Sequence, residues 1–393
     1  MPGMRLLRPV LAAAGAAALA ATAGLVPAQG ATTAGWQVTA TVGQNPRVTY
    51  LLDPGGGNAG AGFTATSATD AWSVWGSCDG SCGNKPATIV ERWDGTAWHR
   101  VPTAGLSLTS TDAVAAASAT DAWLFEGYDN NATALHWDGT AWTSSALPPW
   151  AIRFNESGVV QISAADFGPS DIWLFTLGQQ GLSPQTPYAG HFNGKSWVKR
   201  LLPAIPDEVD AVARNDIWAL GTPGNLSGGQ ILMHWDGTAW STLALPIPTV
   251  PPGDSAFFYA PASSGPSDLW LAQYVAKNQG SPGTTSLEHW NGTGWQPVPL
   301  RYRTSSVDAT ASDGSGGLWM IFNGPRPGFT DYFAHLASGG SWTRTVVPAA
   351  TGTTVQQASV ITAIPGSASA WAAGELIVPG QGSGGIVGAI WQH

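Results

Sequence analysis

The stretch LHWDGTAW, Leu135–Trp142, contains a histidine, a carboxylate and two indoles within eight residues. Nearly the same letters occur four more times, as VERWDGTAW at 90–98, GHFNGKSW at 190–197, MHWDGTAW at 233–240 and EHWNGTGW at 288–295. A single binding site does not need five copies along one chain. We therefore interpret the stretch as part of a repeated structural unit.

A second element, a short polar turn followed by a tryptophan, recurs seven times. Its tryptophans are spaced by 51, 50, 45, 52, 49 and 52 residues, without helix-forming runs between them. A period near 50 residues is typical of a propeller in which each unit is one blade. We predict an all-β fold, a seven-bladed β-propeller of four-stranded antiparallel blades. The seven turns are SATDAW (67–72), SATDAW (118–123), GPSDIW (168–173), ARNDIW (213–218), GPSDLW (265–270), GSGGLW (314–319) and GSASAW (366–371).

The second unit illustrates the four predicted strands. DAVAAAS is the inner strand a, AWLFEG strand b, ATALHW strand c and TAWTSS strand d. Asp-Gly or Asn-Gly follows strand c in five units, and this dipeptide is the strongest short signal for a hairpin. Because both central residues of a type I′ turn have positive φ, we expect that turn type between strands c and d.

The seventh unit ends at Trp391-Gln-His393, before any strand d. The segment AGWQVTATV at 34–42 matches the strand d of the other units. We predict that this N-terminal strand completes the last blade. Closing the ring in this way removes the open sheet edges that otherwise invite aggregation.

Nineteen of the 21 tryptophans occupy repeated positions, and only Trp75 and Trp150 do not. Periodic aromatic residues are usually core residues, so we expect the nineteen to fill the space between blades. Five histidines also repeat, one position before the strand c aromatic or, in unit six, before Leu336. Such positions point to separate places around a ring rather than to one metal ion. We expect each to hydrogen-bond the Asp of the S-x-x-D turn, except that unit six has Gly317 there. The histidines are His136, His191, His234, His289 and His335.

The N-terminus indicates export. Arg5 and Arg8 precede an Ala-rich run and then Val26-Pro27-Ala28, which fits a signal peptide over residues 1–28. Residues 29–393 are then a single propeller domain, expected to be secreted, extracellular and monomeric, without membrane insertion after signal removal. In that oxidising compartment Cys78 and Cys82 are expected to form a local disulfide.

Composition and motifs exclude several functions. The formal net charge is −9 and only 10% of residues are charged, so no basic stripe is available for nucleic acid. The sequence contains neither G-x-S-x-G nor H-E-x-x-H. We therefore predict no metal, no cofactor and no catalytic residue.

With its D-x-W turns and H-W-D-G-T-x-W stretches, the mature chain resembles secreted bacterial β-propellers of the kelch/galactose-oxidase-like and WD-repeat-like superfamilies. The resemblance covers all seven units and implies the propeller fold. Propellers of this kind serve as lectins, scaffolds, hydrolases and oxidases, so the resemblance does not select a function.

Candidate site residues are those that break the repeat. In a propeller the a–b and c–d turns share one face and the b–c and d–a loops share the other. The second set is long and different in every unit, and such loops usually carry recognition. Aromatic side chains beside charges suit stacking on a sugar ring or anchoring a peptide. The ligand-binding candidates are Trp75, Tyr128, Asp129, Trp150, Arg153, Glu156, Arg301, Tyr302 and Arg303.

Two functions remain open at this point. The first is an exported, non-enzymatic binding protein that recognises an extracellular glycan or protein through the variable loops. The alternative is an extracellular carbohydrate-active hydrolase or lyase whose acidic loop residues converge at the channel mouth. Its candidate carboxylates are Asp129, Glu156, Asp207, Glu208, Asp254, Asp308 and Asp331.

Overall fold

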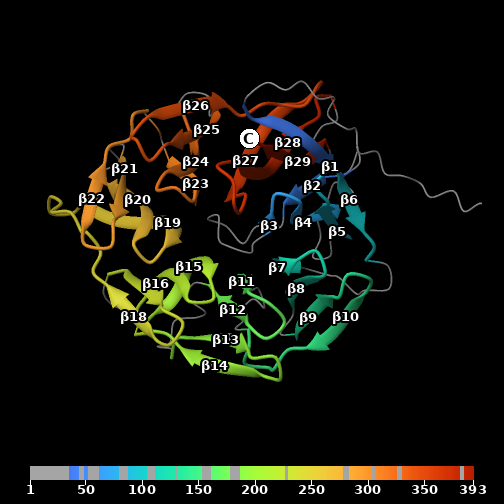
Figure 1. Ribbon diagram of the computed structural model, residues 1–393. Coiled ribbons are helices and arrows are strands. Elements are labelled where there is room, and N and C mark those ends of the chain that lie inside the picture. The colour runs from blue at the N-terminus through green and yellow to red at the C-terminus, as the bar shows by residue number, and fades with distance from the viewer. Residues whose placement is uncertain are drawn as a thin grey trace, which may run out of the picture.

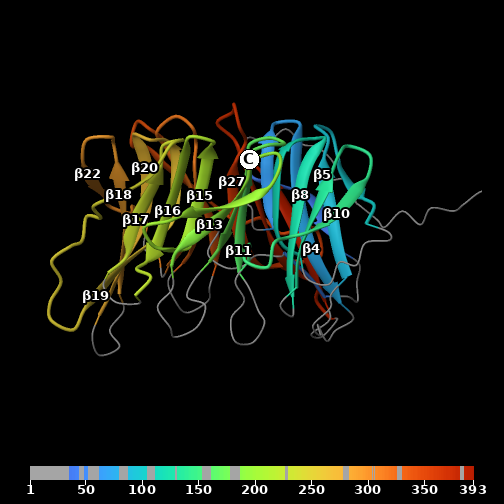
Figure 2. The same cartoon turned by 90° about the horizontal axis from the view of Figure 1, so that it is seen from below.

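The strands form seven antiparallel sheets arranged as a ring (Figure 1). Seen from the side, they run between the two faces of a disc (Figure 2). This confirms the predicted seven-bladed propeller. Within the described part, no helix is long and apolar enough to cross a membrane. The computed structural model describes residues 35–43, 48–51, 62–78, 87–103, 111–128, 131–152, 161–177, 186–225, 229–277, 283–302, 304, 306–324, 330–380 and 385–393.

Six blades are regular sheets with strand a innermost and strand d outermost. From a to d, blade two contains β7 (Thr111–Ser118), β8 (Asp121–Tyr128), β9 (Asn131–Trp137) and β10 (Trp142–Ala146); blade three contains β11 (Ile162–Asp166), β12 (Ile172–Thr176), β13 (Tyr188–Phe192) and β14 (Trp197–Leu201); blade four contains β15 (Ile205–Ala213), β16 (Asp216–Thr222), β17 (Ile231–Trp235) and β18 (Trp240–Leu243). Blade five contains β19 (Ser255–Gly265), β20 (Asp268–Ala276), β21 (Thr284–Trp290) and β22 (Trp295–Val298); blade six contains β23 (Ser306–Ser312), β24 (Leu318–Asn323), β25 (Asp331–Leu336) and β26 (Trp342–Val346); blade seven contains β27 (Thr354–Ala363), β28 (Ala370–Ile377), β29 (Ile386–Gln392) and β1 (Gln37–Val42).

Blade one differs because its inner strand is in two pieces. The blade contains β2 (Val48–Leu51), β3 (Phe63–Ser67), β4 (Asp70–Cys78), β5 (Ala87–Trp93) and β6 (Trp98–Val101). The strand β2 pairs with the second half of β4, and β3 pairs with the first half. Two strands therefore pair along the inner edge of β4 where the other blades have one, which the repeat did not predict.

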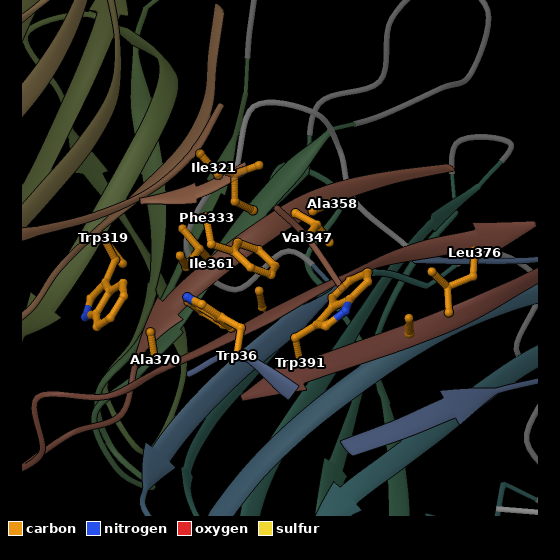
Figure 3. Packing of buried hydrophobic residues seen from close by; sticks show 14 of the residues in the cluster. Trp36, Trp319, Ile321, Phe333, Val347, Ala358, Ile361, Ala370, Leu376 and Trp391 are labelled. Atoms are coloured by element: carbon orange, nitrogen blue, oxygen red, sulfur yellow. The ribbon is translucent and has the colours of Figure 1, made fainter. Parts of the chain in front are cut away.

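The ring closes as predicted, because β1 pairs antiparallel with β29 from Gln37 opposite Gln392 to Val42 opposite Gly388. Trp36, just before β1, stacks on Phe333 with ring centroids 4.0 Å apart. It also meets Trp319 edge to face at 5.5 Å. Figure 3 shows these rings with Trp391 in the core between blades six and seven. The two ends of the propeller are thus joined by backbone pairing and by packing.

The repeated tryptophans hold neighbouring blades together. The strand b tryptophan of one blade packs against strands c and d of the next, as Trp72 does against Trp137 and Trp142, each 6.3 Å away between centroids. Trp371 of blade seven contacts Trp93 and Trp98 of blade one in the same way. Because all seven strand b indoles are at most 8% exposed, these side chains are core, as predicted.

Each repeated histidine lies on the opposite side of its strand from the residue that follows it, which is Trp137, Phe192, Trp235, Trp290 or Leu336. His136 stacks on Trp123 of its own blade at 4.3 Å, and its Nε2 lies 2.8 Å from Asp121 Oδ1. The predicted histidine–aspartate pairs are present in blades two to five. In blade six the histidine pairs instead with Asp313, four residues before Gly317. His335 Nε2 lies 2.8 Å from Asp313 Oδ2. Blade one uses Arg92 and Asp70 instead.

The predicted type I′ turn is wrong, although the hairpin is correct. Trp137 pairs with Trp142, so four residues connect strands c and d, and of these only Gly139 has positive φ (95°). Asp138 Oδ1 accepts hydrogen bonds from the N–H groups of Ala141 and Thr140 and from the Thr140 hydroxyl. These bonds lower the pKa of Asp138 to about 2. The aspartate side chain thus replaces part of the backbone bonding of a two-residue turn.

Gly139 is also required by close packing. A Cβ at this position would lie 2.7 Å from Thr120 Cγ2, in the a–b turn of the same blade. The corresponding glycines of blades one, three, four and five face the same contact. The c–d hairpin therefore rests directly on the a–b turn, and both lie on one face of the disc.

Trp36→Ala should lower the free energy of unfolding by about 3–5 kcal/mol, because it removes the large side chain that joins β1 to blade six. Chemical denaturation followed by circular dichroism measures the change. Thr343→Ala, an exposed change on strand d of blade six, should stay within about 0.5 kcal/mol of the wild type. Equal stability of the two variants would show that Trp36 does not secure the closure.

Gly139→Ala should destabilise the protein by roughly 1–2 kcal/mol, because alanine is strained at this φ and meets Thr120. The matched control is Gly339→Ala in the c–d turn of blade six, where a Cβ has open space and φ is not positive. A smaller loss of stability in the first variant than in the control would contradict this account.

Candidate functional site

Trp75 is a core residue, so its prediction as a ligand-binding residue is wrong. It is fully buried between blades one and seven, and its Nε1 donates to Ser73 Oγ at 2.9 Å. Its ring occupies the space that a side chain at Gly388 would need, since a Cβ there would lie 2.4 Å from the ring. The extra tryptophan therefore fills a gap left by a glycine of the adjacent blade.

Several other candidates fall outside the described part. Asp129, Arg153, Glu156 and Arg303 are among these residues, as is Cys82 of the predicted disulfide. The backbone of Tyr128 ends β8, but its side chain is not described. Their predicted roles remain predictions.

Trp150 lies between blades two and three, in the segment that joins β10 to β11. Its ring meets Tyr188 of β13 edge to face at 6.0 Å, and the Tyr188 hydroxyl donates to the Trp150 carbonyl at 2.6 Å. Lys199 of β14 places its Nζ 4.4 Å from the Tyr188 ring and 5.2 Å from the Trp150 ring. We name Trp150, Tyr188, Lys199 and the adjacent Leu201 the blade-three cluster.

Tyr302 forms a similar cluster between blades five and six. The Arg344 guanidinium of β26 lies 4.5 Å from the Tyr302 ring and 4.8 Å from the Tyr332 ring. Phe322 stacks beneath both tyrosine rings, at 5.9 Å and 5.3 Å. We name Tyr302, Tyr332, Arg344 and the adjacent Val346 the blade-six cluster.

The two clusters occupy equivalent positions of the repeat. Each tyrosine is three residues before its strand c histidine, and each cation is two residues after its strand d tryptophan. The register agrees, because Tyr188 pairs with Leu201 and Tyr332 pairs with Val346. Each cluster also takes one aromatic side chain from the d–a segment. Both therefore lie between two blades, near the outer edge of the variable-loop face.

Sequence reasoning found Trp150 and Tyr302 but missed their strand partners. Those partners looked like ordinary strand residues, and only a comparison of equivalent positions distinguishes them. No other blade combines a tyrosine with a cation at these two positions. The pairs there are Ile89 and Arg100, Thr133 and Ser144, Ile231 and Thr242, Ser286 and Pro297, and Val387 and Val38.

The cations and apolar side chains of the clusters are accessible. Lys199 and Arg344 are exposed, and neither forms an ion pair with another described residue. Leu201 and Val346 are 67% and 53% exposed, two of only five large apolar side chains on the surface of the described part. Arg301, also exposed, precedes Tyr302. Each cluster thus offers half-buried rings, an exposed apolar side chain and a positive charge that has no carboxylate partner in the part of the chain that the structure describes.

The candidate catalytic carboxylates that are described each have a partner within the fold. Asp207 accepts from the Thr222 hydroxyl at 2.8 Å, and Asp254 pairs with Lys277 Nζ at 3.0 Å. Asp308 accepts from the Ser306 hydroxyl at 2.7 Å and from the Asn323 amide. Among the described residues, no group of three or more acidic, histidine or cysteine side chains is arranged to hold a metal ion.

Glu208 and Asp210 brace the inner strands of two blades. Glu208 accepts a hydrogen bond from Ala260 N–H of β19, and Asp210 accepts one from Ser263 N–H at 2.6 Å. Ala260 has a φ of 51° in a bulge of β19, an arrangement that costs roughly 1–2 kcal/mol for a residue with a side chain. Burial raises the pKa values of both carboxyl groups to about 7. Their contacts indicate a role in holding the ring together.

These raised pKa values predict that stability falls as the pH rises from about 4.5 to about 7. A carboxyl group with a raised pKa in the folded state binds its proton there while the unfolded chain has lost it, so rising pH favours unfolding. Glu91 and Asp166 add to the effect, since burial raises their pKa values to about 7 as well. Thermal unfolding measured between pH 4 and pH 8 tests this.

Glu208→Gln isolates the contribution of Glu208 to the pH dependence of stability. Glutamine keeps an oxygen that can accept from Ala260 N–H, but it cannot ionise. The variant should be more stable than the wild type at pH 8, by on the order of 1–3 kcal/mol, and the difference should shrink toward pH 4.5. A stability difference that does not change with pH would exclude ionisation of Glu208 as the cause.

No protein-family description matches this chain, and no curated protein is similar to it in sequence. Among solved structures, YCF48 bound to a D1 peptide is similar, with a TM-score of 0.52 and 14% identity over 88% of this chain and 97% of that chain. A PL25 ulvan lyase, described as a polysaccharide lyase bound to -[GlcA(1-4)Rha3S]-, has a TM-score of 0.48 and 12% identity over 87% and 95% of the two chains. A six-bladed fucose-recognising lectin from Aleuria aurantia has a TM-score of 0.42 and 16% identity over 74% and 99%. At these identities, the similarity to YCF48 shows a shared propeller fold and leaves the ligand open.

Proposed function

We propose that this protein is an exported, non-enzymatic binding protein that recognises an extracellular glycan through the blade-three and blade-six clusters. The observation that carries the proposal is their equivalence. The same combination of d–a aromatic, strand c tyrosine and strand d cation occurs in two blades, where the other five blades have other residues.

The chemistry of the clusters suits a sugar chain. Exposed parts of half-buried aromatic rings pack against the C–H groups of a pyranose ring, and an unpaired cation attracts a hydroxyl, carboxylate or sulfate group. The rings are also preorganised, since Phe322 supports both tyrosines of the blade-six cluster and the Tyr188 hydroxyl holds the Trp150 backbone. Such rigid side chains lose little conformational entropy on binding.

Two equivalent clusters in one rigid ring favour a ligand that repeats. The clusters lie in blades three and six, which occupy different positions around the ring (Figure 1). A chain with recurring sugar units offers the same group to both, and simultaneous engagement increases the overall affinity. A protein partner would instead require a continuous interface of about 800 Å² on this molecule, and the exposed apolar side chains are scattered.

The enzymatic alternative has no specific support from the described carboxylates. Asp207, Glu208, Asp308 and Asp331 all accept hydrogen bonds from fold groups, and Asp254 is paired with a lysine. Their contacts are explained by bracing between strands. Accordingly, we expect binding without depolymerisation of the glycan.

Lys199→Ala and Arg344→Ala test the proposal, because both side chains are exposed and their loss should not disturb the core. Each variant should weaken binding to an extracellular polysaccharide about 10-fold, and the double variant about 100-fold or more. Binding is measured on arrays of neutral and acidic glycans and then by calorimetry. Trp150→Ala and Tyr302→Ala should have the same effect, through loss of the ring surfaces.

Thr242→Ala is the matched control, since Thr242 is exposed at the equivalent position of blade four. It should bind like the wild type. If the wild type binds no glycan, or if the double variant binds as tightly as the control, the proposal is wrong. Release of shortened, reducing or unsaturated sugar ends during incubation would instead support the enzymatic alternative.

A further inference from the structure

A cavity of about 300 Å³ opens between blades six and seven. It lies at the variable-loop end of both blades, because its lining comes from the start of β25, the end of β26 and the start of β27. The lining combines hydroxyl and amide groups of Thr330, Thr354 and Gln356 with the apolar side chains of Val347 and Ala349. This volume is at the lower end of the range for ligand pockets.

Asp331 supplies the only charge in this lining. Its side chain is 8% exposed, and one oxygen, Oδ2, accepts a hydrogen bond from Ala358 N–H of β27 at 2.8 Å. Within the described part of the chain, the carboxylate has no other hydrogen-bond donor and no cationic partner. The second oxygen, Oδ1, therefore has acceptor capacity left for a donor that enters the cavity.

Comparison with the other blades shows that this arrangement is specific to blade six. The equivalent residue in blade four is Gln230, four residues before the strand c histidine, which bonds both the N–H and the carbonyl of Phe258 with its amide. In blade three the equivalent residue is Pro187, which has no polar side chain. Bracing the next blade therefore does not require a carboxylate at this position.

The cavity and the blade-six cluster lie on opposite faces of the same blade. Asp331 and Tyr332 are consecutive residues of β25, so their side chains point to opposite sides of the sheet. Asp331 faces blade seven, where it bonds Ala358, and Tyr332 packs in the core shared with blade five. Val346 borders both sites, but Asp331 and Ala349 are not part of the blade-six cluster, and Tyr302 and Arg344 are not part of the cavity lining. Substitutions at these four positions therefore address one site each.

We propose that this cavity binds one neutral pyranose unit, whose hydroxyl groups donate to the free oxygen of Asp331. The choice of a sugar rests on the proposed glycan-binding function, and the site is additional to the two clusters. A neutral ligand follows from the described lining, because Asp331 would repel an anion and no Lys or Arg is among the lining residues to pair with one. Thr330, Thr354 and Gln356 supply donors and acceptors for the remaining hydroxyls, and Val347 and Ala349 supply an apolar wall.

Saturation-transfer NMR and calorimetry with free neutral hexoses, 6-deoxyhexoses and N-acetylhexosamines test the inference on the full chain. At least one of these sugars should bind the wild type. Asp331→Asn should weaken binding at least 10-fold, because its side-chain carbonyl can still accept from Ala358 N–H while an NH₂ group replaces the free acceptor. Ala349→Leu should also abolish binding, by filling the cavity without altering Asp331.

Thr242→Ala is the control, since Thr242 is exposed, lies outside both clusters and the cavity lining, and should leave monosaccharide binding unchanged. The inference is overturned if no sugar in the panel binds, if both cavity variants bind like the wild type, or if only a simple primary amine binds. Polysaccharide binding that is lost in the double variant of Lys199 and Arg344 but unaffected by Asp331→Asn would leave the clusters supported while removing this site.

Discussion

Each strand b tryptophan contributes to a packing unit on which the ring depends. In blade two, the Trp123 indole stacks on His136 of its own blade and meets Phe192 of blade three. In blade three, Trp173 stacks on His191 and packs against Trp235 and Trp240 of blade four. A four-stranded sheet cannot bury its own faces, so this contact between neighbours makes an isolated blade unstable and a closed ring stable. Blade seven satisfies the same requirement by borrowing β1 and Trp36 from the N-terminus.

The candidate binding groups occupy positions that this packing leaves free. The tryptophans and histidines serve the core near the face that carries the hairpins, while the tyrosine three residues before the histidine lies toward the other face. At that end a side chain from the d–a segment packs between the blades, as Trp150 does against Tyr188 and Tyr302 does against Phe322. Only blades three and six place an aromatic residue and a cation there. Their difference from the other blades is therefore more informative about function than the repeated stretch that contains LHWDGTAW.

Backbone N–H groups of the inner strands β19 and β27 are bonded by a second set of polar side chains. Glu208, Asp210 and Asp331 each reach across to a backbone N–H of the next blade. Inner strands of neighbouring blades do not pair as one sheet, so a side-chain acceptor is one way to satisfy a backbone donor near the channel. Burial raises the pKa values of these carboxyl groups, so the stability of the scaffold is expected to depend on pH.

The period of the repeat was sufficient to determine the number of blades, the strand order and the closure by the N-terminal strand, because these follow from burying the same apolar pattern seven times. It also determined the histidine–aspartate pairs of blades two to five, since both residues recur at fixed distances from the buried tryptophan. Two kinds of feature were decided only by the tertiary structure: turns in which a side chain replaces a backbone hydrogen bond, and contacts between neighbouring blades. Asp138 bonds the turn backbone itself, which replaces the expected type I′ geometry, and Asp313 substitutes for the aspartate missing in blade six. Trp75 is core only because Gly388 of the adjacent blade leaves room for it. The two clusters emerge because residues distant in sequence meet across a blade interface, a proximity that a linear pattern does not contain.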